Sequence, residues 1–202
     1  RMWTSPITFV ATSNAALMLG AQVEFVDVDP KTGNLCVLHL REKLAMAYDA
    51  GCLPDMLVPV HLTGRSCPMQ QIRGLADQYG IRVVEDASHA LGGTYQGEAI
   101  GICRHSDAAV FSFHPVKSIT TGEGGAVMTN SADLAESMRE IRHHGITRDR
   151  CKLIKSGQPG YYHEQQRMGF NFRLSDIHAA LGCSQLTRLG SFVQQRRYLA
   201  AH

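Results

Sequence analysis

The chain has 202 residues, a length that suits one or two domains. Hydrophobic residues make up 44% and charged residues 19%, so the sequence can bury a core and is not intrinsically disordered. Twenty basic residues against 18 acidic ones leave a net charge of +2, which is too balanced for a protein that binds nucleic acid through charge. The composition predicts a soluble globular chain.

Neither a membrane span nor a cysteine motif is visible. The residues Gln22, Glu24 and Asp27 interrupt the most apolar stretch before it reaches the roughly 18 residues of a span. Six cysteines are widely spaced without a C-x-x-C pair, which argues against a zinc or redox motif. We therefore expect reduced thiols in a cytoplasmic protein, with no metal and no membrane contact. Because Arg1 is not methionine and His202 falls within a helical pattern, we expect a fragment.

Short apolar strands alternate with helical patterns along the chain. In order, we expect a small helix ended by Gly20, a strand at 21–29, a helix at 38–47, a strand at 55–64, a helix at 69–80, strands at 81–86, 108–113 and 125–130, a helix at 131–143, a long loop at 145–170, and helices at 175–188 and from 191 onward. Such alternation is typical of a parallel sheet with helical crossovers. The predicted fold class is α/β, a three-layer α/β/α sandwich.

Polar residues follow two of the predicted strands, at the edge where parallel sheets bind ligands. Asp86 ends one strand, whereas Ser112, His114 and Lys117 lie at and after the end of the next. A glycine-rich turn at 120–125 would let the backbone approach a ligand closely. By residue type alone Lys117 is a solvated loop lysine, but a desolvated amine there would be a nucleophile. A lysine amine together with a carboxylate for a pyridinium nitrogen predicts a pyridoxal phosphate site.

Four ordered motifs resemble those of a known family. They are SPITFVATSNAALMLGAQVEFVDVD, VVEDASHALGGTYQG, VFSFHPVKSITTGEGGAVMTN and GFNFRLSDIHAALGCSQL. On these motifs the sequence is identified as a member of the DegT/DnrJ/EryC1/StrS sugar aminotransferases, which are fold-type I pyridoxal-phosphate enzymes. The stretches SFHPVKSITTGEGG, RHHGITRD and YYHEQQ resemble the pseudaminic-acid branch of that family.

The resemblance implies a role for each matching residue. Lys117 would be the catalytic residue, which forms the internal aldimine and carries a proton between the amino-acid α-carbon and the cofactor. Asp86 would keep the ring nitrogen protonated, and His89 would lie near the ring. Ser112 would bind the cofactor phosphate, and Phe9 would stack on the ring. Plainer structural roles stay open for three of these: a histidine satisfied in a polar loop, a serine at a strand end and a core phenylalanine.

The resemblance also implies partners and a domain plan. Asn171 would reach the cofactor phosphate of a neighbouring subunit, which implies a homodimer. Arg173 and His114 would bind substrate. Residues 1–190 would form the cofactor-binding large domain, incomplete at its N-terminus, and 191–202 would begin a helix leading to a small C-terminal domain.

The implied reaction is transfer of an amino group from L-glutamate to the 4-keto carbon of a UDP-linked, N-acetylated 6-deoxy sugar. Two alternatives stay open: the same chemistry on a different nucleotide sugar, and a non-catalytic ligand-binding domain with the aminotransferase fold. The sequence argues against a dinucleotide-binding domain, because no G-x-G-x-x-G motif follows a predicted strand. Since the sugar dehydratases of the family replace the lysine, the presence of Lys117 favours transamination.

Overall fold

The computed structural model describes residues 1–202 and contains two compact units. The first comprises Arg1–Asn130 with Ile177–His202, and the second comprises Ser131–Asp176. The domain boundary expected at residue 190 lies inside the first unit and stays a prediction, because a compact unit need not be a whole domain.

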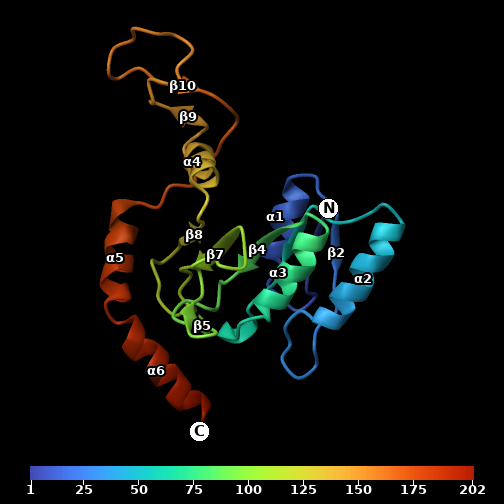
Figure 1. Cartoon of the computed structure of the whole chain (residues 1–202). Coiled ribbons are helices and arrows are strands. Elements are labelled where there is room, and N and C mark those ends of the chain that lie inside the picture. The colour runs from blue at the N-terminus through green and yellow to red at the C-terminus, as the bar shows by residue number, and fades with distance from the viewer. The chain divides into compact units, whose positions relative to one another are not determined.

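A six-stranded sheet forms the centre of the first unit (Figure 1). Its order is β2-β1-β3-β4-β7-β8, with bounds Val23–Phe25, Met2–Thr4, Met56–Val58, Arg82–Asp86, Ala108–Ser112 and Gly125–Met128. Neighbouring strands are parallel from β2 to β7, and β8 runs antiparallel to β7. The predicted α/β class is confirmed.

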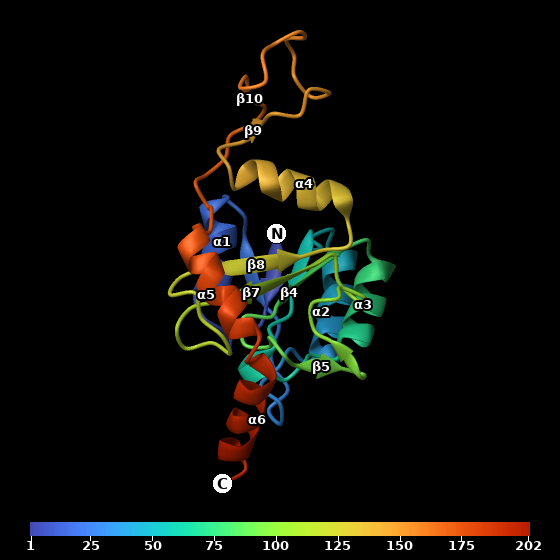
Figure 2. The same cartoon turned by 90° about the vertical axis from the view of Figure 1, so that its left-hand side faces the viewer.

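Helices cover both faces of this sheet (Figure 2). The chain moves outward from β1 to β2 through α1 (Ala11–Met18), then returns across β1 to β3 through α2 (Val37–Asp49) and on to β4 through α3 (Met69–Gln78). Because such crossovers are right-handed, the reversal of direction puts α1 on one face and the other two helices on the opposite face. The helices α5 (Asp176–Leu186) and α6 (Leu189–Ala200) follow at the end of the chain.

The buried side chains explain why the strands pair in this order. Trp3 and Val83 are at most 1% exposed and pack with Leu40 of α2 and Ile72 of α3. On the other face, Met2 and Val58 pack with Ala16 of α1. Successive residues of a strand face opposite sides, so each short strand contributes to two layers. This alternation produces the predicted three-layer sandwich.

Two glycines end helices as the sequence predicts. Gly20 follows α1 and Gly80 follows α3, with φ of +72° and +68°. These left-handed conformations are the usual way to terminate a helix, and glycine adopts them without a steric penalty.

Several short strands were not predicted. They are β1, the hairpin of β5 (Thr94–Tyr95) and β6 (Glu98–Ala99), and the pair of β9 (Ile146–Thr147) and β10 (Glu164–Gln165) inside the expected loop 145–170. The second unit holds that last pair together with α4 (Ala132–Ile141), whose first turn is capped by the Ser131 hydroxyl. None of the helices has both the length and the apolar composition that crossing a membrane requires.

Candidate functional site

Asp86 and Ser112 lie at the carboxyl ends of two neighbouring parallel strands. Asp86 ends β4 and pairs in register with Val110 of β7, so Ser112 follows two residues further along the adjacent strand. This is the edge at which open parallel sheets bind ligands. The structure therefore brings together the strand ends that the sequence singled out.

The Asp86 carboxylate is held by two hydrogen bonds. The Thr12 hydroxyl donates to Oδ2 at 2.6 Å, and the Ser88 backbone N–H donates to Oδ1 at 3.1 Å. Thr12 lies in the first turn of α1, the next element of the chain after β1, and its hydroxyl is also 3.2 Å from that of Thr8. Sequence reasoning missed Thr12, because β1 is too short to be recognised and its end was not seen. The position of Thr12 within the first family motif is the signal that could have indicated it.

His89 lies within electrostatic reach of both Asp86 and Lys117. Burial lowers the pKa of His89, the Lys117 charge lowers it further, and the Asp86 charge raises it. Its Nδ1 accepts a hydrogen bond from the Thr63 backbone N–H at 3.3 Å. With Nδ1 acting as acceptor, the neutral ring carries its proton on Nε2.

Lys117 is half-buried in a loop that closes on itself after β7. The Lys117 N–H donates to the His114 carbonyl at 2.9 Å. At the base of the loop, the Phe113 N–H donates to the Gly124 carbonyl, and the Phe113 carbonyl accepts from the Thr121 N–H. These bonds fix where the loop leaves and rejoins the sheet.

Ser112 retains a free donor for an anion. Its Oγ accepts the His114 N–H at 3.3 Å, so its hydroxyl proton remains available to a phosphate oxygen. The His114 side chain is exposed at the start of the loop. Phe9 is 72% exposed, which excludes a place in the core for it and leaves its ring open to a stacking partner.

Asn171 and Arg173 belong to the second compact unit. Both are exposed, and the Arg173 Nε donates to the Asn171 Oδ1 at 2.7 Å. Asn171 also pairs with His143 in an isolated β-bridge. The roles expected for Asn171 and Arg173 remain predictions.

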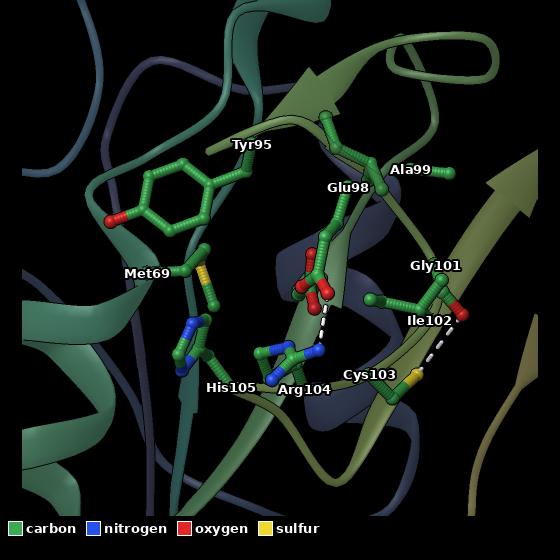
Figure 3. Close-up of a pocket in the computed structure, with 11 residues that line it drawn as sticks. Met69, Tyr95, Glu98, Ala99, Gly101, Ile102, Cys103, Arg104 and His105 are labelled. Atoms are coloured by element: carbon green, nitrogen blue, oxygen red, sulfur yellow. Dashed lines mark hydrogen bonds and ion pairs between the residues drawn. The ribbon is translucent and has the colours of Figure 1, made fainter.

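A small cavity lies apart from these residues, beside the β5–β6 hairpin (Figure 3). Its volume is about 20 Å³, which suits a single water molecule. The side chains of Met69, Tyr95 and His105 line it, and Glu98 forms an ion pair with Arg104 at its rim. It shares no residue with the Lys117 loop and is too small for a substrate.

The donor set at the strand ends fits pyridoxal phosphate. The Asp86 carboxylate suits a protonated ring nitrogen, the neutral His89 imidazole suits the ring, and the Lys117 amine suits the aldehyde carbon. The Ser112 hydroxyl suits one phosphate oxygen.

Comparisons with known proteins identify the family of the chain. The model of the DegT/DnrJ/EryC1/StrS aminotransferase family matches residues 2–202. A Campylobacter jejuni protein named UDP-4-amino-4,6-dideoxy-N-acetyl-beta-L-altrosamine transaminase is 39% identical over 199 residues, which are 98% of this chain and 49% of the relative. The Bacillus subtilis spore coat polysaccharide biosynthesis protein SpsC is 36% identical over 98% of this chain and 48% of its own length.

Solved structures show the same fold. Helicobacter pylori PseC, described as an aminotransferase in the biosynthesis of pseudoaminic acid, has a TM-score of 0.79 at 36% identity, over 94% of this chain and 46% of that protein. The sugar aminotransferase CalS13 from Micromonospora echinospora has a TM-score of 0.84 at 31% identity, over 99% of this chain and 52% of its own. The chain spans about half the length of the curated relatives it matches. It belongs to the DegT/DnrJ/EryC1/StrS aminotransferase family.

Proposed function

We propose that this chain is the cofactor-binding part of a pyridoxal-phosphate-dependent aminotransferase that acts on a nucleotide-linked 4-keto sugar. The observation that best supports the proposal is the placement of Asp86 and Ser112 at the ends of neighbouring parallel strands, with His89 and Lys117 on the loops that follow those two strands. A ligand-binding domain without catalysis would need the carboxylate but not a lysine amine beside it.

The cofactor, when bound, supplies an electron-accepting ring and an aldehyde carbon that the Lys117 amine can bond. Asp86, held by Thr12 and the Ser88 N–H, would keep the ring nitrogen protonated. Lys117 would carry the proton between donor α-carbon and cofactor, and then return it toward the sugar carbon. Ser112 would anchor the phosphate through its free hydroxyl proton.

The finer substrate assignment rests on the relatives. We propose a UDP-linked 4-keto-6-deoxy-N-acetylhexosamine as the amino acceptor and L-glutamate as the donor, because the Campylobacter jejuni relative is named as an altrosamine transaminase. His114 and Arg173 are exposed and cationic or polar, which suits contacts with sugar hydroxyls or phosphates. A pseudaminic-acid-type pathway in the cytoplasm is part of the same proposal.

We further propose a homodimer in which Asn171 of one subunit reaches the cofactor phosphate of the other. The support is the family resemblance of the GFNFRL segment, together with its exposed Asn171. Phe170 and Phe172 stack with ring centroids 4.8 Å apart, and Phe172 is 65% exposed, so the segment offers apolar area for a subunit contact.

Covalent trapping tests the cofactor assignment. Borohydride reduction of the full-length protein loaded with pyridoxal phosphate, followed by peptide mapping, should place the pyridoxyl group on Lys117. Lys117→Ala should remove the label and abolish turnover with little effect on the fold, because a half-buried loop lysine contributes little packing. The matched control is Lys31→Ala, which changes an exposed lysine far from the site in sequence and should keep the label. A label on another lysine would refute the assignment.

Product analysis tests the substrate. The loaded enzyme is given glutamate and then a UDP-4-keto-6-deoxy-N-acetylhexosamine, the corresponding sugar on a different nucleotide, or pyruvate. Amination of the UDP sugar supports the proposal. Amination only of the other nucleotide sugar would correct the substrate class, and amination only of pyruvate would indicate an ordinary amino-acid aminotransferase.

A further inference from the structure

Helix α6 is hydrogen-bonded to the backbone of Lys117. The Arg196 guanidinium donates from Nη2 to the Lys117 carbonyl oxygen at 2.9 Å, across 79 residues of chain. Between the loop and the helix lies a cavity of about 280 Å³, bordered by residues 117–120 on one side and by Phe192, Gln195 and Arg196 on the other. The contact therefore joins the loop that carries the catalytic amine to a separate element.

The same helix is seated on the loop that carries His89. Gly92 lies so close to α6 that a Cβ at this position would be 2.9 Å from Val193 Cγ2 and 3.4 Å from Leu189 Cδ1. Val193 stands three residues before Arg196, one turn along the same helix. Arg196 thus extends from a helix whose position is set by the neighbouring active-site loop.

Near Lys117, the loop is held by fewer backbone hydrogen bonds than at its base. Its base is fixed by bonds between Phe113 and both Gly124 and Thr121, but these lie several residues from the lysine. The Lys117 N–H donates to the His114 carbonyl within the loop. The Lys117 carbonyl accepts a hydrogen bond from Arg196, which lies outside the loop.

We propose that Arg196 is a positioning residue: through the Lys117 carbonyl it fixes the backbone that carries the cofactor-bonding amine. The inference rests on the proposed function, since it needs Lys117 to be the residue that bonds the cofactor. Small displacements of a reacting group reduce the rate of a bond-forming step, even when the group itself is unchanged.

Timed trapping tests the inference in the full-length protein. Pyridoxal phosphate is mixed with the apoprotein, borohydride is added at intervals, and the pyridoxyl label on Lys117 is quantified. A lost hydrogen bond from a charged donor at an exposed position predicts roughly tenfold slower attachment in Arg196→Ala and Arg196→Gln. Arg196→Lys, which keeps a charged donor, should recover part of the rate, and guanidinium chloride at low millimolar concentration should partly rescue Arg196→Ala. In steady state, kcat for the sugar should fall more than KM changes.

Arg197→Ala is the matched control, because Arg197 is the next residue of the same helix, is also exposed, and does not line the cavity beside the loop. Melting temperatures of all variants show whether each is folded, and Arg196→Gln replaces Arg196→Ala if the alanine variant is not. Attachment at the Arg197→Ala rate in a folded Arg196→Gln or Arg196→Ala protein would overturn the inference while leaving the proposed function intact. If the unmodified protein takes no label on Lys117, the proposed function itself fails.

Discussion

At the scale of single residues, His89 reports on both charges of the site. Burial is the main cause of its lowered pKa, so the fold favours the neutral ring. In the unfolded chain the same ring has a pKa of about 6.5 and takes up its proton first as the pH falls. The contribution of His89 to stability is therefore complete above that pH and is lost as the pH falls through the lower, folded-state value.

The His89 pKa should move in opposite directions when each neighbouring charge is removed. Lys117→Gln removes a positive charge and should raise the pKa, whereas Asp86→Asn removes a negative charge and should lower it further. An NMR titration of the His89 ring protons in the cofactor-free protein measures both shifts, with Lys31→Gln as a control that leaves the pKa in place. An unchanged His89 pKa in both site variants would contradict the proximity of the three groups.

The residues of the site were predictable where a recognisable strand precedes them. Asp86 ends a strand of five residues and Lys117 follows another, and both were singled out by these positions. Thr12 follows a strand of three residues, which carries too little periodicity to be noticed, so the partner of the Asp86 carboxylate was missed. Phe9 was predicted from resemblance only, and its exposure in the structure removes the alternative of a core residue.

At the scale of elements, strand β4 ends in two carboxylates that face opposite sides of the sheet. Glu85 is 5% exposed, and its side chain accepts from the His61 Nε2 at 2.7 Å and from the Ser106 hydroxyl. The His61 Nδ1 accepts the Cys67 N–H at 3.1 Å, so the ring proton lies on Nε2 and points to Glu85. Burial raises the pKa of the Cys67 thiol to about 12, which keeps this neighbour uncharged.

Neighbouring substitutions on β4 should therefore have different consequences. Glu85→Ala leaves the buried His61 and the half-buried Ser106 without their acceptor and should cost roughly 3 kcal/mol of unfolding free energy. Asp86→Ala should cost at most about 1 kcal/mol, because this carboxylate is half-buried, but it should abolish cofactor binding. Urea unfolding of the two variants, beside their absorbance after loading with pyridoxal phosphate, separates the effects. An equal loss of unfolding free energy in the two variants would contradict the assignment of a structural role to Glu85 and a cofactor-binding role to Asp86.

Element by element, helices were easier to predict than strand pairing. Their apolar periodicity and terminal glycines placed α1 to α3 within a few residues, as at Gly20 and Gly80. The β5–β6 hairpin was missed because its strands have two residues each, although Gln96 and Gly97 both adopt the positive φ of a tight turn. The direction of β8 depends on tertiary pairing with β7, which no local pattern encodes.

At the scale of the whole molecule, the predicted site residues are divided between two compact units. Lys117 and Asp86 lie in the first, whereas Asn171 lies in the second. The second unit has its own ionic centre: Glu140 is 5% exposed and pairs with Lys152 at 2.8 Å and with Arg167 at 3.4 Å. These ion pairs fix the local structure of the unit that carries Asn171, as the role proposed for Asn171 in a neighbouring subunit would require.

Mixing two inactive variants tests whether the active site is shared between subunits. Lys117→Ala and Asn171→Ala should each be inactive alone, because one lacks the amine and the other lacks a phosphate contact. If Asn171 serves the partner, a mixed dimer has one doubly altered site and one intact site. After equal mixing and subunit exchange, half of the dimers are mixed, so about a quarter of the unmodified activity should return.

The control is Lys117→Ala mixed with Asp86→Ala. Both residues are proposed to act within their own subunit, so every site then carries a change and no activity should return. Subunit exchange is verified by mass spectrometry of differently tagged chains. If activity then returns in neither mixture, Asn171 does not act in the site of the partner subunit.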